Sequence, residues 1–176
     1  DWDALAALPT GTLGSAYRSL ATRDRIRVGD LVEADRKHRS GEPEVQEWLR
    51  ARLIGSHDLL HVITGYERDS PGEMLLIAFT HGIVPKRIFR VILFFGLFGT
   101  PLRHLPRFLV DLRRAWRRGR DANIPRSTHW EHLLALPLDE ARLRLEIAPA
   151  AATHNGRIWR EEPTSGAWTR VELTAA

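Results

Sequence analysis

Residues 57–73 read HDLLHVITGYERDSPGE, and this stretch predicts how the chain folds around it. Gly65 indicates the end of a helix, because glycine readily adopts the left-handed backbone that closes one. Pro71 indicates the start of the next helix, because proline is favoured in a first helical turn. Apolar residues at helical spacing precede the glycine, and a second apolar run follows the proline. The stretch therefore predicts two helices joined by a short turn.

Four side chains of this stretch are able to bind a metal ion: His57, Asp58, His61 and Glu73. Residues four apart on a helix share one face, so His57 and His61 present two imidazoles to one point. Asp58 lies about 100° around the helix from His57, and its carboxylate reaches the same point from the flank. Glu73 has to arrive from the second helix. The chain has no cysteine, so any metal depends on nitrogen and oxygen ligands of this kind.

Two of the four residues also have a purely structural interpretation. Ser70 followed three residues later by Glu73 fits a capping box, in which the glutamate bonds back to the serine backbone. Asp58 fits an ion pair with a nearby arginine such as Arg52. At this stage the histidine pair is the part of the constellation that helical geometry supports independently.

If an ion binds, two imidazoles and one or two carboxylates suit zinc, and they suit iron(II) as well. Both ions remain open at this point. Another arrangement, His38 with His57-Asp58 and the distant Asp111, follows the residue order of many metal-dependent phosphohydrolases. It is the less favoured interpretation, because that order requires neither His61 nor Glu73.

Outside the central stretch, apolar residues at helical spacing predict a mainly α, single-domain helical bundle. Pro106 is expected to weaken the helix that contains it. Two short segments, 157–161 and 167–173, flank a turn and predict a small C-terminal β-hairpin. The expected domains are a helical domain over 1–149 and an extension over 150–176. The expected helices cover residues 13–20, 25–39, 42–64, 70–82, 88–99, 101 to beyond 116, 129–136 and 139–147.

Charge is distributed unevenly along the chain. Eleven basic residues and two aspartates lie between Lys86 and Arg126, although the whole chain has a net charge of only +4. The apolar run Ile88–Gly99 is too short to span a bilayer. We expect it to line a lipid groove or to lie among lipid headgroups, with the arginines from Arg103 to Arg120 facing anionic lipid. The alternative is a core helix followed by a solvated basic helix; nucleic acid is disfavoured, since no recognised motif accompanies the arginines.

These residues resemble the COQ-four family of ubiquinone biosynthesis proteins, whose signature is His-Asp-x-x-His, eleven residues, then Glu. Here the signature consists of His57, Asp58, His61 and Glu73, with the spacing intact. The likeness covers about residues 9–149. Weaker matches are Thr10–Gly14 with Tyr17, His61–Tyr66, Ala115-Trp116 with Gly119, and His129–Glu131 with the helix that leads to Ile147.

The resemblance implies a mostly helical, dimer-forming, membrane-associated protein that acts on a polyprenylated hydroxybenzoate precursor of ubiquinone. The implied reaction removes the ring carboxyl group at C1 and is coupled to hydroxylation there. By this likeness His57, Asp58, His61 and Glu73 are catalytic residues and ligands of a divalent metal, with zinc the first expectation and iron the second. Family members also organise a biosynthetic complex, so a non-catalytic lipid-binding scaffold is the alternative function.

One stretch departs from the family pattern. Thr80-His81-Gly82 stands where the family usually has a glutamate and a glutamine before the glycine, which leaves substrate and metal preference open. His81 is a candidate proton carrier, although a residue at a helix end is the simpler interpretation. The single methionine is Met74, so we expect a processed or trimmed chain. The expected location is peripheral, on the cytoplasmic face of a bacterial inner membrane or the matrix side of a mitochondrial one.

Overall fold

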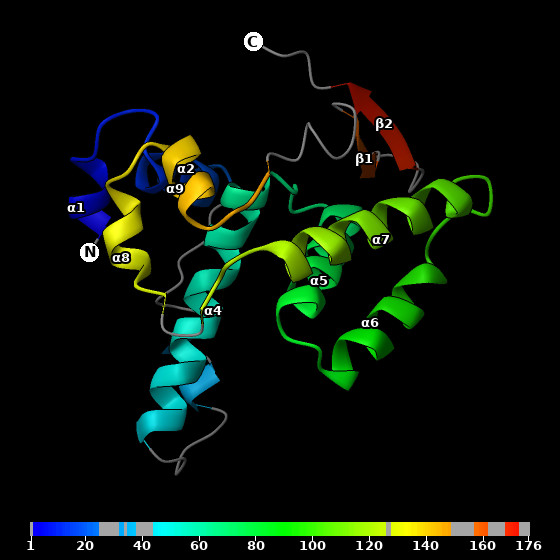
Figure 1. The fold of residues 1–176 in the computed structure, drawn as a ribbon, viewed down its shortest axis with the longest axis horizontal. Coiled ribbons are helices and arrows are strands. Elements are labelled where there is room, and N and C mark those ends of the chain that lie inside the picture. Colours follow the sequence, from blue (N-terminus) through cyan, green and yellow to red (C-terminus); the bar gives the residue numbers. More distant parts are fainter. Residues whose placement is uncertain are drawn as a thin grey trace. The chain divides into compact units, whose positions relative to one another are not determined.

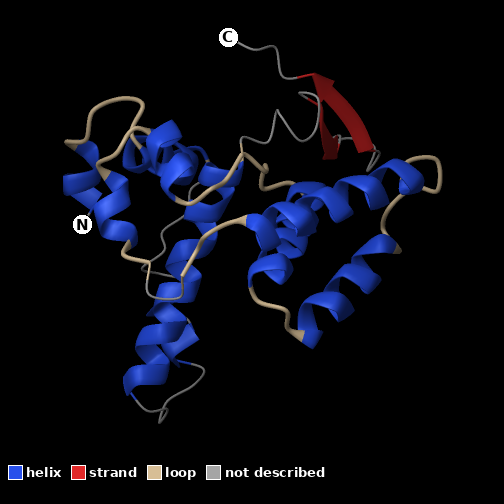
Figure 2. Cartoon of the chain, in the orientation of Figure 1, coloured by secondary structure: helices blue, strands red, loops and turns tan. Residues whose placement is uncertain are grey.

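The computed structural model describes residues 2–24, 32–33, 35–37, 44–125, 128–148, 157–161 and 168–172. Helices dominate this part of the chain, which confirms the prediction of a mainly α fold (Figures 1 and 2). The predicted helix over 25–39 lies largely outside the described residues. The helices are α1 (Trp2–Ala6), α2 (Leu13–Arg23), α4 (Glu44–Thr64), α5 (Ser70–Ile83), α6 (Arg87–Leu97), α7 (Leu105–Asp121), α8 (Trp130–Leu134) and α9 (Leu138–Arg144).

The chain divides into two compact units. The first unit consists of Asp1–Ile63 and His129–Ala141, and the second of Thr64–Thr128 and Arg142–Ala176. In the first unit, the backbone around Thr12 pairs with the turn before α9. Leu13 N–H donates to the Leu136 carbonyl and Leu138 N–H donates to the Gly11 carbonyl, each at 2.9 Å. These bonds fix the start of α2.

The second unit is built on the crossing of α5 and α7. Apolar side chains of α5, including the fully buried Phe79, pack against a stripe on α7 that recurs every three or four residues. Two glycines lie at the crossing. A Cβ added at Gly119 would overlap the carbonyl of Phe79, and one added at Gly82 would overlap the carbonyl of Trp116. The close approach of the two backbones therefore requires glycine at both positions.

α7 starts at Leu105 and not at Pro101, where the sequence predicts the start of this helix. Pro106 was expected to weaken a helix, but it lies in the first turn of α7, where a missing backbone N–H costs little. The expectation for Pro106 is therefore wrong. The predicted hairpin corresponds to β1 (Arg157–Glu161) and β2 (Trp168–Glu172), which pair antiparallel with Ile158 opposite Val171.

Among the described residues, no helix combines the length and the apolar character that crossing a bilayer requires. The longest helix, α4, has 21 residues but carries charged side chains along its length. The most apolar exposed helix, α6, has only 11 residues.

Candidate metal centre

The two histidines of the predicted site lie one turn apart on α4. Their ring centroids are 4.9 Å apart, and the ring planes meet at 72°. His61 is almost completely buried, whereas His57 is partly exposed. Helical geometry therefore places two imidazoles together on one face, as the four-residue spacing predicts.

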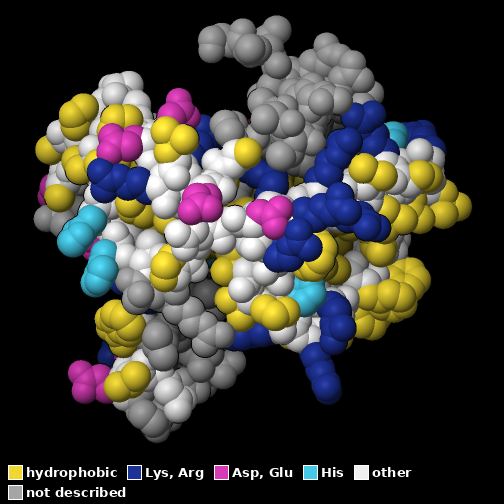
Figure 3. Space-filling view, in the orientation of Figure 1, with side chains coloured by type: hydrophobic (Ala, Val, Ile, Leu, Met, Phe, Trp, Pro, Cys, Tyr) yellow, Lys and Arg dark blue, Asp and Glu magenta, His cyan; other side chains and the backbone are white. Residues whose placement is uncertain are grey.

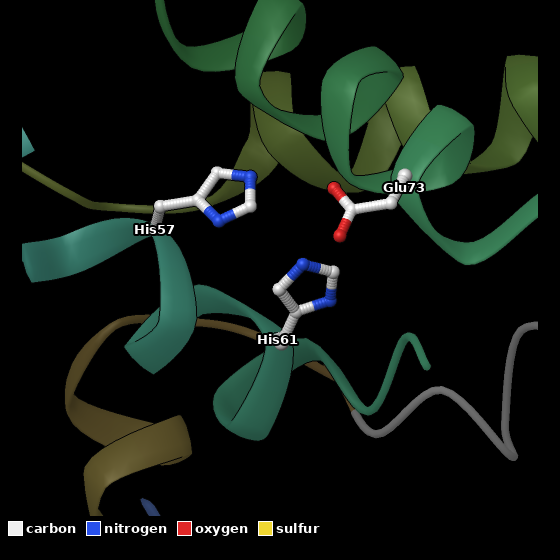
Figure 4. Close-up of side chains that lie close together, drawn as sticks. All are labelled: His57, His61 and Glu73. Carbon is white, nitrogen blue, oxygen red and sulfur yellow. The ribbon is translucent and has the colours of Figure 1, made fainter. Parts of the chain in front are cut away.

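Glu73 lies in the first turn of α5, twelve residues after His61 in the chain. His57, His61 and Glu73 each offer one ligand atom, and these three atoms all lie within 4.8 Å of one another. Figure 4 shows both imidazole rings and the Glu73 carboxylate pointing toward a common space. Two neutral imidazole nitrogens and one carboxylate oxygen form a donor set that suits a divalent transition metal. This group could hold a metal ion.

The start of α5 corrects the capping-box interpretation of Glu73. The N-cap is Asp69, whose side chain accepts a hydrogen bond from Gly72 N–H at 2.9 Å. The Glu73 N–H donates to the Asp69 carbonyl at 2.9 Å. Ser70 is thus the first helical residue and not the cap, so the predicted box of Ser70 and Glu73 is wrong. Capping no longer explains why a glutamate stands at position 73.

Asp58, the fourth predicted ligand, is not part of the group of three. Its side chain is only 4% exposed, and its Oδ1 lies 3.5 Å from Nδ1 of His57. Residues one apart on a helix point about 100° apart, which separates Asp58 from the shared face of the two histidines. Arg52, the suggested partner of Asp58, is 3.2 Å from Glu131 in an ion pair. A direct Asp58–metal bond stays a prediction.

Gly65 ends α4 as predicted, with a φ of 76° that glycine adopts without strain. The last carbonyl of the helix, that of Thr64, accepts a hydrogen bond from Arg118 Nη2 at 3.1 Å. The same nitrogen also donates to the carbonyl of Ala148. A cation that donates to a C-terminal carbonyl supplies the hydrogen bond that this carbonyl lacks within the helix. Its positive charge also interacts favourably with the negative end of the helix dipole.

Arg118 is a residue whose role the sequence did not reveal. It was expected to face lipid with the other arginines, but its guanidinium lies 5.0 Å from the ring centroid of Tyr66 and 5.8 Å from that of Phe79. Its Nε and Nη1 are buried without a hydrogen-bond partner in the described part of the chain. Burial raises the pKa of Tyr66, and the neighbouring Arg118 opposes that rise. The position of Arg118 on the same helical face as Ala115 could have identified it.

The remaining candidates lie apart from the group. His81 is in the last turn of α5, about 12 Å along the helix axis from Glu73, and its ring is 6.2 Å from that of Phe89. This supports its interpretation as a residue near a helix end. Asp111, from the phosphohydrolase pattern, is on α7 with its Oδ1 3.5 Å from Arg114, and His38 falls outside the described residues. Within those residues, the group that could bind a metal comprises His57, His61 and Glu73.

The helices and this group define a mainly α protein with a candidate two-histidine, one-carboxylate metal site at a helix–turn–helix junction. The family model described as "Coenzyme Q (ubiquinone) biosynthesis protein Coq4" matches residues 1–151. The chain therefore belongs to the Coq4 family of coenzyme Q (ubiquinone) biosynthesis proteins, and it has a role in ubiquinone biosynthesis.

A solved structure supports the same assignment. The chain is similar to the crystal structure of a "Putative ubiquinone biosynthesis protein" from Nostoc punctiforme PCC 73102, with a TM-score of 0.64 and 25% sequence identity. The match covers 82% of this chain and 67% of the Nostoc chain. No curated protein matches this sequence.

Proposed function

We propose that this protein catalyses metal-dependent removal of the C1 carboxyl group from a polyprenylated hydroxybenzoate on the route to ubiquinone, at the surface of a membrane. The observation that carries the proposal is the convergence of His57, His61 and Glu73 within 4.8 Å. Membership of the family supports a role in ubiquinone biosynthesis. The donor set supports the chemistry, since two imidazoles and one carboxylate leave coordination positions for substrate.

In the proposed mechanism, a divalent ion supplies Lewis acidity to the carboxylate or phenolic oxygens of the substrate. His57, His61 and Glu73 hold that ion. Asp58 holds the imidazole of His57 in orientation through its nearby Oδ1, in the way that carboxylates orient metal-bound histidines. The buried position of His61 restricts water on its side of the site. Loss of carbon dioxide with protonation of C1 needs no co-reactant, whereas the coupled hydroxylation requires dioxygen as oxidant.

The proposal is tested first by metal content. Protein stripped with a chelator is reloaded with Zn²⁺ or, without air, with Fe²⁺, and bound metal is measured by mass spectrometry. We expect about one ion per chain in the wild type, and a loss of affinity of about tenfold or more in His61→Ala and Glu73→Gln. His132→Ala is the matched control, because His132 is an exposed histidine on α8.

The second test is turnover of a 4-hydroxy-3-methoxy-5-polyprenylbenzoate, followed as loss of the carboxylated substrate. We expect activity in the metal-loaded wild type and in His132→Ala, and none in folded His61→Ala. Unchanged turnover in folded His61→Ala would contradict the assignment. A metal whose removal unfolds the protein, combined with no turnover in any metal form, would instead favour a non-catalytic lipid-binding scaffold.

A further inference from the structure

The outward face of α6 is apolar from Ile88 to the C-cap Phe98. No residue of this helix is buried, although its inner side contacts α5, where Gly96 lies against the side chain of Met74. Phe89, Leu93 and Leu97 are half-buried around that glycine. The exposed large side chains of the helix and its C-cap are Ile88, Val91, Ile92, Phe94, Phe95 and Phe98.

Helix geometry shows that these six side chains form one continuous surface. At about 100° per residue they occupy an arc of about 160° on the side opposite Leu93, and Arg87 adds a cation to this arc at the start of the helix. A helix that faces water normally carries polar residues on this side. Three phenylalanines cluster at its C-terminal end: the ring centroid of Phe94 is 5.6 Å from that of Phe95 and 5.3 Å from that of Phe98. We call these six residues the α6 apolar face.

Cations border the α6 apolar face at both ends. Lys86, Arg87 and Arg90 lie at its start, and Arg103 follows its end, beyond the exposed Leu102. Figure 3 shows yellow apolar side chains next to dark blue lysine and arginine side chains over the part of the molecule that carries α6 and α7. No acidic residue lies between Lys86 and Arg107. The charge of this segment is therefore of a single sign.

This combination identifies the kind of partner. A second copy of the chain docked through the same face would bring the arginines of both copies together, and like charges oppose that contact. An anionic lipid surface instead accepts aromatic and aliphatic side chains at the depth of the acyl chains and the cations among the headgroups. Eleven helical residues extend about 16 Å, which suits a helix lying in the plane of the interface.

We propose that the α6 apolar face is the membrane-docking surface of this protein, and that it inserts into bilayers rich in anionic lipid with Lys86, Arg87, Arg90 and Arg103 contacting the headgroups. This deepens the proposed function, on which it rests for the nature of the substrate: a polyprenyl tail is held in a bilayer, and α6 brings the protein to that surface.

The test is flotation of the full chain with phosphatidylcholine vesicles, with or without phosphatidylglycerol. The variant replaces Phe94, Phe95 and Phe98 together by serine. We expect the wild type to float with the anionic vesicles and to dissociate as salt is raised, and the variant to lose about a hundredfold in partitioning. Leu143→Ser is the matched control, because Leu143 on α9 is 78% exposed, close to the 75% of Phe98.

A second variant, with Arg87, Arg90 and Arg103 replaced by glutamine, is expected to lose most of the preference for anionic vesicles. Circular dichroism and bound metal establish that each variant is folded. Equal flotation of wild type and triple-serine variant would overturn the proposal. A variant that changes from dimer to monomer in lipid-free ultracentrifugation, with its flotation intact, would also overturn it and would assign the face to a second copy.

Failure of the docking surface is distinguishable from failure of the proposed function. Turnover and metal content are measured in detergent micelles, where docking to a bilayer is not needed. If the triple-serine variant keeps both in micelles but no longer floats, the two proposals stand together. If the wild type floats but neither binds metal nor turns over substrate, the docking surface stands and the proposed function fails.

Discussion

The helices α5 and α6 are both apolar in sequence, yet they occupy opposite environments. α5 contributes seven buried residues, while α6 contributes none. The difference arises from what surrounds each helix. α5 crosses α7 closely on one side and contacts α6 on another, whereas α6 packs mainly against α5, on its inner side. An apolar run therefore does not by itself predict a buried helix. The neighbouring helices decide whether its side chains are buried or exposed.

Truncating one phenylalanine on each helix tests most directly whether α5 is buried and α6 exposed. Phe79 on α5 is 0% exposed and Phe95 on α6 is 65% exposed. Phe79→Ala is expected to lower the free energy of unfolding by about 4 kcal/mol, because it leaves a cavity. Phe95→Ala is expected to change it by less than about 0.5 kcal/mol. Urea denaturation measures both, and equal losses would show that α6 is buried in solution.

The helix crossing offers the next largest effect. Gly119→Ala places a methyl group against the carbonyl of Phe79, and α5 and α7 must separate. We expect a loss of about 3 kcal/mol. The control is Gly99→Ala, because a Cβ at Gly99 would meet only the Gly96 carbonyl, at 3.7 Å, an ordinary contact. Thermal unfolding of both variants tests this, and a stable Gly119→Ala protein would contradict the close crossing.

Substitutions at Arg118 and Arg117 compare an inward-pointing cation with an exposed one on the basic helix α7. Arg118→Met removes the hydrogen bonds to the carbonyls of Thr64 and Ala148, with an expected cost of about 2 kcal/mol. Arg117→Met, at an exposed neighbouring position, is expected to be nearly neutral in stability. Chemical denaturation of the two variants gives the difference directly. Similar values for both would place Arg118 at the surface with its neighbours.

Substitutions at Asp69 and Ser70 test which of the two residues caps the start of α5. Asp69→Ala removes the side-chain acceptor of Gly72 N–H and is expected to cost about 1 kcal/mol. Ser70→Ala, at the first helical position, is expected to cost no more than about 0.5 kcal/mol. Equilibrium unfolding compares them. The reverse order would restore the capping box and, with it, the structural explanation of Glu73.

The smallest expected effect is a dependence of stability on alkaline pH. Burial raises the pKa of Tyr66 in the folded protein, so the folded state keeps a proton that the unfolded state releases. The stability that this group contributes is present below the unfolded pKa of about 10 and is lost as pH rises through the folded value. The unfolding free energy of the wild type should therefore fall above pH 10, and that of Tyr66→Phe should fall less. The chain has two tyrosines and two lysines, so few other groups titrate there.

Much of the fold could be predicted from turn and cap chemistry. Gly65 as a helix end, and Pro71 at the start of the next helix, placed the boundaries of α4 and α5 correctly. The N-cap itself was assigned one residue too late, because aspartate and serine are both good caps and they stand next to each other at 69 and 70. Pro106 was misjudged for a related reason: proline weakens the interior of a helix but suits its first turn.

The candidate site could be predicted only in part. The pairing of His57 with His61 follows from helical repeat alone, whereas the approach of Glu73 depends on the path of the turn between two helices, which no local rule specifies. Asp58 was placed with the ligands by the family resemblance, and the structure puts its carboxylate beside His57. The inward position of Arg118 could not be predicted from the charge of a segment with eleven basic residues, since net charge says nothing about which face of a helix each cation occupies.

The glycine crossing of α5 and α7 has an evolutionary consequence. At Gly82 and Gly119 each backbone occupies the volume that a side chain of the other helix would need. Enlarging either residue alone is penalised, and enlarging both is penalised more, so descendants of this sequence have no stepwise route away from the pair that keeps the same helix spacing.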